Sequence, residues 1–200
     1  IFLTNLGNPK YELSWEKTYL LVKHLSNKIS KDIRLGDRCV IISENRPEWL
    51  ISDLAIMLAG GISVPSYTTY TTKDYDYIIR DCDPSVIIVS NNNQFKKIRD
   101  ILDYKKIKKI ISFDRLENLE LENYLCFEDI INKNDNFETF NSEINLKRSD
   151  PACIIYTSGT QGNPKGVILS HGGILSNCEC GYDLLKSIIS KNMKFLTWLP

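Results

Sequence analysis

The chain has 200 residues, of which 42% are hydrophobic, and its 25 basic and 25 acidic side chains give a formal net charge of zero. This length and composition suffice for one domain with an apolar core. The balanced charge provides no general attraction to nucleic acid or to an anionic membrane surface. No apolar run is long enough to span a bilayer, because glycine and proline interrupt the most apolar segment, residues 54–65.

The start of the chain carries no recognisable targeting signal. Its first residue is Ile1 rather than methionine, and residues 1–12 lack the basic start and apolar block of a signal peptide. We therefore expect an internal piece of a longer chain whose true N-terminus lies upstream. The six cysteines form no CxxC pair, which favours free thiols over disulfides or a metal site.

Helix and strand patterns alternate along the first half of the chain. Apolar spacing predicts a helix over residues 14–29, with Ser14 as its N-cap. The residues on its apolar face are Trp15, Tyr19, Val22, Leu25 and Ile29. Buried strands are predicted over residues 38–43, 62–67, 85–90 and 108–112. Further helices are predicted over residues 47–58, 75–81 and 94–103.

Local signals mark the ends of two of these helices. Pro47 suits a first helical turn, and Gly60 with Gly61 ends the same helix. Thr71 and Asp74 form a capping-box pattern before the next helix.

The second half of the chain is less regular. Residues 114–150 are acidic and poorly periodic, which predicts a surface excursion with one short helix over 128–132. Strands are predicted over residues 152–157 and 165–170, followed by a helix over 170–189 and the start of a strand at 194–200. The whole pattern predicts an α/β fold: a layered α/β/α parallel sheet in one domain, truncated at Pro200.

The segment YTSGTQGNPKG, residues 156–166, has the composition of a phosphate-binding loop. Its hydroxyls and lysine can donate hydrogen bonds to phosphate, and its glycines let an anion approach backbone N–H groups. The residues predicted to bind a polyphosphate are Thr157, Ser158, Gly159, Thr160, Gly162 and Lys165. A hairpin turn built from ordinary turn residues is the alternative.

This loop differs from the common nucleotide-binding motifs. The Walker pattern G-x-x-x-x-G-K-[ST] would need glycine where Pro164 stands, and it leads into a helix. Here the following residues predict a strand, so the loop should link two strands. A G-x-G-x-x-G dinucleotide motif is absent as well.

The same segment resembles the signature of the adenylate-forming superfamily, which typically reads Tyr-Thr-Ser-Gly-Thr-Thr-Gly-x-Pro-Lys-Gly-Val. Gln161 is the one departure, where threonine or another small or acidic residue is usual. The stretch GDRCVIISENRPEWLISDLAI, residues 36–56, is similar to long-chain fatty acyl-CoA synthetases, in which Ser-Glu-Asn-Arg-Pro-Glu-Trp is common. The resemblance extends over nearly the whole chain.

The resemblance implies an ATP-dependent ligase that forms an acyl-adenylate and then transfers the acyl group to coenzyme A. It implies ATP, Mg²⁺ and coenzyme A as cofactors or co-substrates, a phosphate loop that closes over ATP, and a fatty acid as substrate. It also implies a cytoplasmic location, with peripheral association at the inner face of a membrane left open. The family's Mg²⁺-binding glutamate, ribose-binding aspartate and catalytic lysine belong to segments that this chain lacks.

Accordingly, no residue of this chain is assigned a catalytic or metal-binding role. His171 is expected to make a local structural hydrogen bond, His24 to be a partly exposed structural residue, and Trp49 to lie in the core. Arg46 and Glu48 are expected to form a local pair.

Three functional alternatives remain open from the sequence. The acid could be an aryl acid or an amino acid loaded on a carrier protein rather than a fatty acid. A non-catalytic nucleotide-binding module would be favoured if the chain ended at Pro200.

Overall fold

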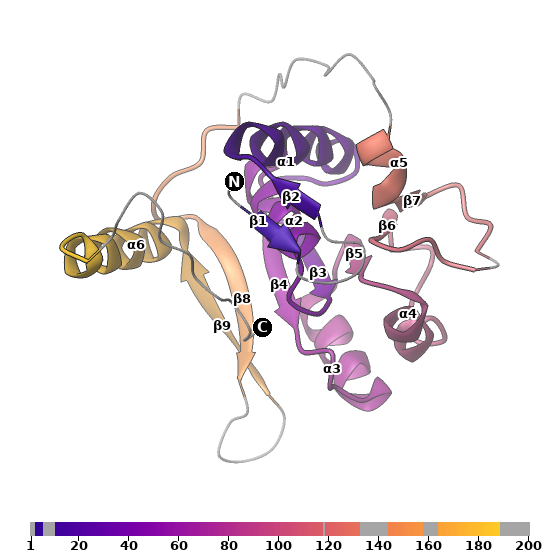
Figure 1. Ribbon diagram of the computed structural model, residues 1–200. Coiled ribbons are helices and arrows are strands. Elements are labelled where there is room, and N and C mark those ends of the chain that lie inside the picture. Colours follow the sequence, from indigo (N-terminus) through magenta and orange to yellow (C-terminus); the bar gives the residue numbers. More distant parts are fainter. Residues whose placement is uncertain (1–2, 6–10, 118, 133–143, 158–163, 189–200) are drawn as a thin grey trace.

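The computed structural model describes residues 3–5, 11–117, 119–132, 144–157 and 164–188. Its centre is a seven-stranded sheet with strand order β7-β6-β5-β3-β4-β8-β9 (Figure 1). The strands are β3 (Arg38–Ile42), β4 (Ile62–Ser66), β5 (Val86–Val89), β6 (Lys109–Ser112), β7 (Tyr124–Cys126), β8 (Pro151–Thr157) and β9 (Lys165–Ser170). All neighbouring pairs are parallel except β8 and β9.

Helices cover both faces of this sheet, which confirms the predicted α/β class. One apolar cluster joins the sheet to α1 (Trp15–Ser30), α2 (Pro47–Leu58) and α5 (Phe127–Asn132). The other joins it to α3 (Thr72–Cys82) and α4 (Asn92–Ile98). Within one strand the side chains alternate between the clusters: Ile41 belongs to the first, and Val40 and Ile42 to the second. Burial on both faces explains the continuous runs of β-branched residues.

The remaining elements lie outside the main sheet or at its edge. Strands β1 (Leu3–Asn5) and β2 (Tyr11–Leu13) form a separate antiparallel pair, which the sequence patterns do not predict. Helix α6 (His171–Leu185) follows β9 at the edge of the sheet (Figure 1). Among the described residues no helix is both long and apolar enough to cross a membrane.

The predicted helix starts are confirmed in atomic detail. Ser14 Oγ accepts a hydrogen bond from Lys17 N at 3.0 Å, and Pro47 occupies the first turn of α2. Thr71 and Asp74 form the complete capping box of α3. Gly60 adopts φ of +80° directly after α2, a backbone conformation that favours glycine.

The predicted apolar face of α1 is wrong at its first turns. Val22, Leu25 and Ile29 are buried, but Trp15 and Tyr19 are 67% and 61% exposed. At about 100° per residue, Tyr19 lies about 120° around the helix axis from Leu25, outside the arc of buried residues. Trp15 lies at about 80°, between the buried Val22 and Ser26, so its exposure comes from its place at the start of the helix and not from its angle. The expectation of a partly exposed His24 is also wrong, because this side chain is buried. Trp49 packs partly buried against the first cluster, as predicted.

Two further predictions need correction. Helix α4 begins two residues earlier than expected and ends at Ile98, five residues short of the predicted end at residue 103. The segment 114–150 is not only a surface excursion, since it contributes strand β7 to the sheet, and Phe127 and Ile130 to the core. The short helix predicted there is confirmed as α5. The strand predicted at residues 194–200 lies outside the described residues.

Asp37 joins three chain segments at the amino-terminal edge of the sheet. Its carboxylate accepts hydrogen bonds from Arg34 N at 3.1 Å and Ser85 Oγ at 2.9 Å, and Lys108 Nζ lies 3.6 Å away. Burial raises the pKa of Asp37, but the two hydrogen bonds and the nearby positive charges outweigh this, so its pKa lies below the ordinary value.

We expect Asp37→Asn to lower the free energy of unfolding by about 1 kcal/mol at pH 7, because an amide replaces a hydrogen-bonded charge. A depressed folded-state pKa stabilises the protein above the unfolded value of about 4, and this contribution disappears as the pH falls through the folded pKa. The difference from the wild type should therefore narrow below about pH 4. Urea denaturation at pH 7 and pH 3 checks this. The control is Asp100→Asn at an exposed position, which should leave the free energy of unfolding unchanged at both pH values. An equal difference at both pH values would contradict it.

Candidate phosphate-binding site

The predicted phosphate loop departs from the end of an antiparallel hairpin. Strand β8 pairs with β9, and the pair nearest the loop joins Thr157 to Lys165. The expected strand–loop–strand arrangement is therefore confirmed, and α6 follows β9 rather than the loop. The other predicted binding residues, Ser158, Gly159, Thr160 and Gly162, lie outside the described residues.

The open end of this hairpin lies at the carboxyl edge of the parallel strands. Strand β8 runs parallel to β4, so Thr157 is at the edge where β3, β4 and β5 also end. Strand β3 leads into a helix on one face of the sheet, whereas β4 and β5 lead into helices on the other face. Open α/β sheets bind ligands at this edge, near such a change of face.

Lys165 presents a mobile positive charge at this position. It is exposed at the first position of β9, and its side chain has no hydrogen bond or ion pair with another described residue. An ammonium group on a flexible stem can then contact the oxygens of a phosphate group.

Tyr156 anchors the same end of the hairpin to α3. Its hydroxyl donates a hydrogen bond to Asp81 Oδ2 at 2.6 Å, and the side chain is 4% exposed. Burial raises the pKa of Tyr156, and the hydrogen bond to Asp81 raises it further, so the phenol stays protonated. Sequence reasoning missed Asp81, because the two residues are 75 positions apart and no local pattern joins them.

Polar groups that follow β3 form a second cluster at this edge. Arg46 binds Glu48 through two contacts, at 3.1 and 3.2 Å, and Asp114 through one at 3.0 Å. The local Arg46–Glu48 pair is thus confirmed. Burial lowers the pKa of Arg46, but its hydrogen bonds to Asp114 and Glu48 outweigh this and the pKa is raised. These contacts fix the loop before α2, and they occupy the guanidinium with protein carboxylates.

His171 begins α6 beside the hairpin. Its backbone N–H donates to Asp150 O at 3.0 Å. Its side-chain Nε2, in contrast, is buried without a hydrogen-bond partner among the described residues, so the structural bond expected of His171 is made by its main chain only. Ser170 caps the helix by accepting from Gly173 N at 3.1 Å, and His171 is given no chemical role.

Strand β9 and α6 expose an apolar surface. No residue of α6 is buried among those described, and large apolar side chains of both elements reach solvent. They are Val167, Ile168, Leu169, Leu175, Tyr182, Leu184 and Leu185. The described residues therefore enclose the hairpin on its β4 side only.

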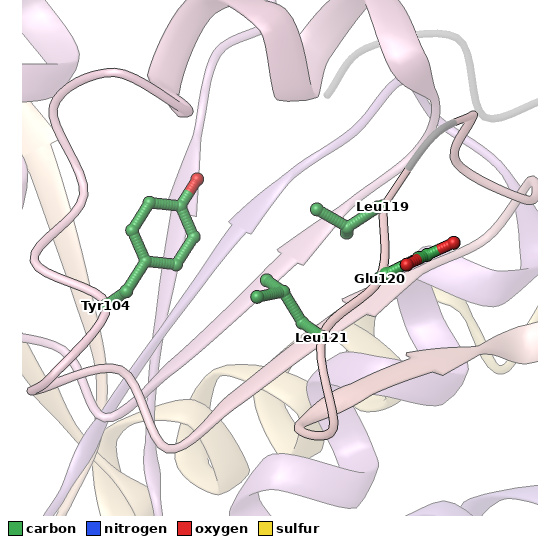
Figure 2. A pocket seen from close by; sticks show the side chains of 4 residues that line it. All are labelled: Tyr104, Leu119, Glu120 and Leu121. Atoms are coloured by element: carbon green, nitrogen blue, oxygen red, sulfur yellow. The ribbon is translucent and has the colours of Figure 1, made fainter.

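A cavity of about 490 Å³ lies elsewhere, between the loops that precede β6 and β7. Figure 2 shows Tyr104 facing Leu119 and Leu121, with Glu120 directed away from them. Because it is at the amino-terminal side of those strands, this cavity is at the opposite edge of the sheet from the hairpin end.

No group of three or more histidine, cysteine, aspartate or glutamate side chains within the described ranges could hold a metal ion. Four cysteines are buried as free thiols, and Cys178 and Cys180 are exposed on α6. The expectation of free thiols holds for all six.

Comparison with known proteins agrees with the three-layer α/β domain described above. The family model of AMP-binding enzymes matches residues 2–200, and the chain belongs to this family. The resemblance to adenylate-forming enzymes is thereby confirmed.

Among curated proteins, the chain is 30% identical over 189 residues to the rat long-chain-fatty-acid–CoA ligase ACSBG1, covering 90% of this chain and 26% of that protein. It is 36% identical over 140 residues to rat ACSBG2, covering 67% of this chain and 21% of that ligase. The chain thus spans about a quarter of the length of these relatives.

Solved structures share the fold. ATP-bound MatB from Rhodopseudomonas palustris superposes with a TM-score of 0.70 at 24% identity, covering 90% of this chain and 34% of that one. The anthranilate CoA ligase AuaEII, in complex with anthranoyl-AMP, gives a TM-score of 0.68 at 24% identity, covering 91% and 33%.

Proposed function

We propose that the full-length protein is an ATP-dependent fatty acid–coenzyme A ligase and that this chain supplies its phosphate-binding hairpin. The observation that supports the proposal is the Thr157–Lys165 pair, because it lies at the carboxyl edge of the parallel strands, the edge at which open α/β sheets bind ligands. The similarity to two fatty-acid ligases favours a fatty acid as the substrate.

The proposed reaction has two steps. The carboxylate oxygen attacks the α-phosphorus of ATP, the bond to the bridging oxygen breaks, and pyrophosphate leaves. The coenzyme A thiolate then attacks the acyl carbonyl, and AMP leaves with the electron pair of the broken C–O bond. In the first step negative charge grows on the departing pyrophosphate, so positive charge and N–H donors placed there lower the barrier.

The residues of this chain act on that leaving group. Lys165 is proposed to contact the β- and γ-phosphate oxygens, together with the hydroxyls of Thr157, Ser158 and Thr160. The resemblance also implies Mg²⁺, but the described residues offer no cluster that fits a metal ion. No Mg²⁺ ligand is therefore assigned to them, and none is assigned for coenzyme A.

The cellular setting is part of the proposal and rests on the resemblance alone. We propose that the full-length protein is cytoplasmic and, as a further proposal, that it associates peripherally with the inner face of a membrane. An aryl acid is the second candidate substrate, because one structural neighbour is described as an anthranilate ligase.

Carboxylate-dependent exchange of pyrophosphate into ATP tests the proposal. We expect the full-length protein to catalyse exchange that increases from acetate to oleate, since longer chains bury more apolar surface in a matching pocket. Benzoate and anthranilate are the matched alternatives. If only the aromatic acids support pyrophosphate exchange, the substrate is an aryl acid and not a fatty acid. If the protein binds ATP but no acid supports exchange, a nucleotide-binding module is favoured.

A further inference from the structure

We propose that Tyr156 and Asp81 are positioning residues, which fix the open end of the β8–β9 hairpin against α3 and so hold Lys165 where phosphate binds. This inference rests on the proposed function, and it assigns a role to two residues outside the phosphate-contacting set. It starts from the way in which the hairpin is attached to the rest of the sheet.

Main-chain pairing holds the hairpin only near its base. Strands β4 and β8 share one registered pair, Ser63 with Cys153, whereas β3 and β4 share five. Beyond Cys153, β8 continues for four more residues to Thr157 without a registered partner in β4. On the other side β9 pairs with no described strand except β8. The backbone ladder alone therefore leaves the end that carries Lys165 weakly restrained.

The Tyr156–Asp81 hydrogen bond supplies the missing restraint. Tyr156 directly precedes Thr157, and the bond length of 2.6 Å is typical of a hydroxyl that donates to a carboxylate. Asp81 is carried by α3, which is itself fixed by its capping box and by the buried side chains of Ile78, Ile79 and Cys82. The bond thus ties the open end of the hairpin to a rigid element of the core.

The absence of a side chain at Gly166 leaves room for the Tyr156–Asp81 contact. It is the register partner of Tyr156 and the residue directly after Lys165. A Cβ atom at Gly166 would lie 2.8 Å from Ile154 Cγ2 and 3.3 Å from Tyr156 Cζ, both too close for the present packing. The missing side chain lets the phenol ring lie against β9 and reach Asp81. Any shift of this ring would also move Lys165, the neighbour of Gly166.

The alternative is that the bond contributes to stability alone. A matched control separates the two roles: Tyr75 is also a buried phenol of the same apolar cluster, and its hydroxyl donates to Tyr67 O at 2.7 Å. Tyr75→Phe and Tyr156→Phe therefore remove the same chemical group and one hydrogen bond each. Only Tyr156 is connected to the hairpin end.

The test compares Tyr156→Phe, Asp81→Asn, the double variant and Tyr75→Phe in the full-length protein. In pyrophosphate exchange, we expect each single hairpin variant to raise the KM for ATP by about tenfold, the effect of losing one hydrogen bond to a charged group. The double variant should show the same tenfold change, because both substitutions remove one shared contact. Tyr75→Phe should change the KM for ATP less than twofold, even if its melting temperature falls by as much as that of Tyr156→Phe.

Hydrogen exchange of the β9 amides provides a readout that needs no ATP. Tyr156→Phe should speed exchange at residues 165–168, whereas Tyr75→Phe should not. Three results would each overturn the positioning role. They are an unchanged rate of hydrogen exchange at residues 165–168 in Tyr156→Phe, a KM for ATP equal to that of the Tyr75→Phe control, and a KM raised about a hundredfold in the double variant, as additive effects would give. Wild-type protein that does not bind ATP would instead overturn the proposed function.

Discussion

Full-length protein carrying Lys165→Ala is expected to lose pyrophosphate exchange by about a hundredfold in kcat/KM for ATP, the usual cost of removing one donor to developing negative charge. Lys165 is exposed at the hairpin end, opposite Thr157, and forms no ion pair with another described residue. Its substitution therefore breaks no described contact. We expect the free energy of unfolding to change by less than about 0.5 kcal/mol.

Two comparisons make this prediction specific. Lys165→Arg should recover part of the activity, because it restores the charge with a different geometry. Lys96→Ala removes an exposed lysine of α4 and should leave both exchange and stability unchanged. Steady-state exchange at saturating acid, with urea denaturation of each variant, measures both effects. Activity equal to that of the wild type in Lys165→Ala would remove the lysine from the phosphate site.

Local signals in the sequence are sufficient to place most elements of this fold. Ser14 and the Thr71–Asp74 box predict helix starts because a cap depends only on neighbouring residues. Strands β3 and β5 are recognisable because burial on both faces requires continuous runs of β-branched side chains. The apolar runs on both sides of the loop likewise predict that it links two strands, and β8 and β9 are those strands.

Features that depend on contacts distant in sequence could not be predicted. Strand β7 has three residues, too few for a periodic pattern, and exists because it pairs with β6. The Tyr156–Asp81 contact joins residues 75 positions apart. The exposure of Trp15 and Tyr19 depends on where the sheet and α2 meet α1, which apolar spacing alone does not specify. The strand–loop–strand frame of the site is thus predictable from the sequence, whereas the Tyr156–Asp81 contact that supports it is not.

Phe127→Ala should cause the largest loss of stability among the substitutions considered, about 4 kcal/mol, although it lies in the segment whose composition suggests a surface excursion. The side chain is 2% exposed, and its ring meets that of Phe113 edge to face with 5.8 Å between centroids. Helix α5 has only six residues, so it depends on this packing rather than on intrinsic helix stability.

Tyr19→Ala is the informative comparison, because the apolar spacing of α1 predicts the opposite ranking. Tyr19 is 61% exposed and its ring contacts only the ammonium group of Lys23, 5.3 Å from the ring centroid, among the aromatic contacts described. Its loss should cost less than about 1 kcal/mol. Urea denaturation of both variants in the full-length protein gives the ranking. Equal losses would mean that α5 and β7 are peripheral attachments, whereas a larger loss for Phe127→Ala places them in the core that supports β6 and, through the sheet, the hairpin.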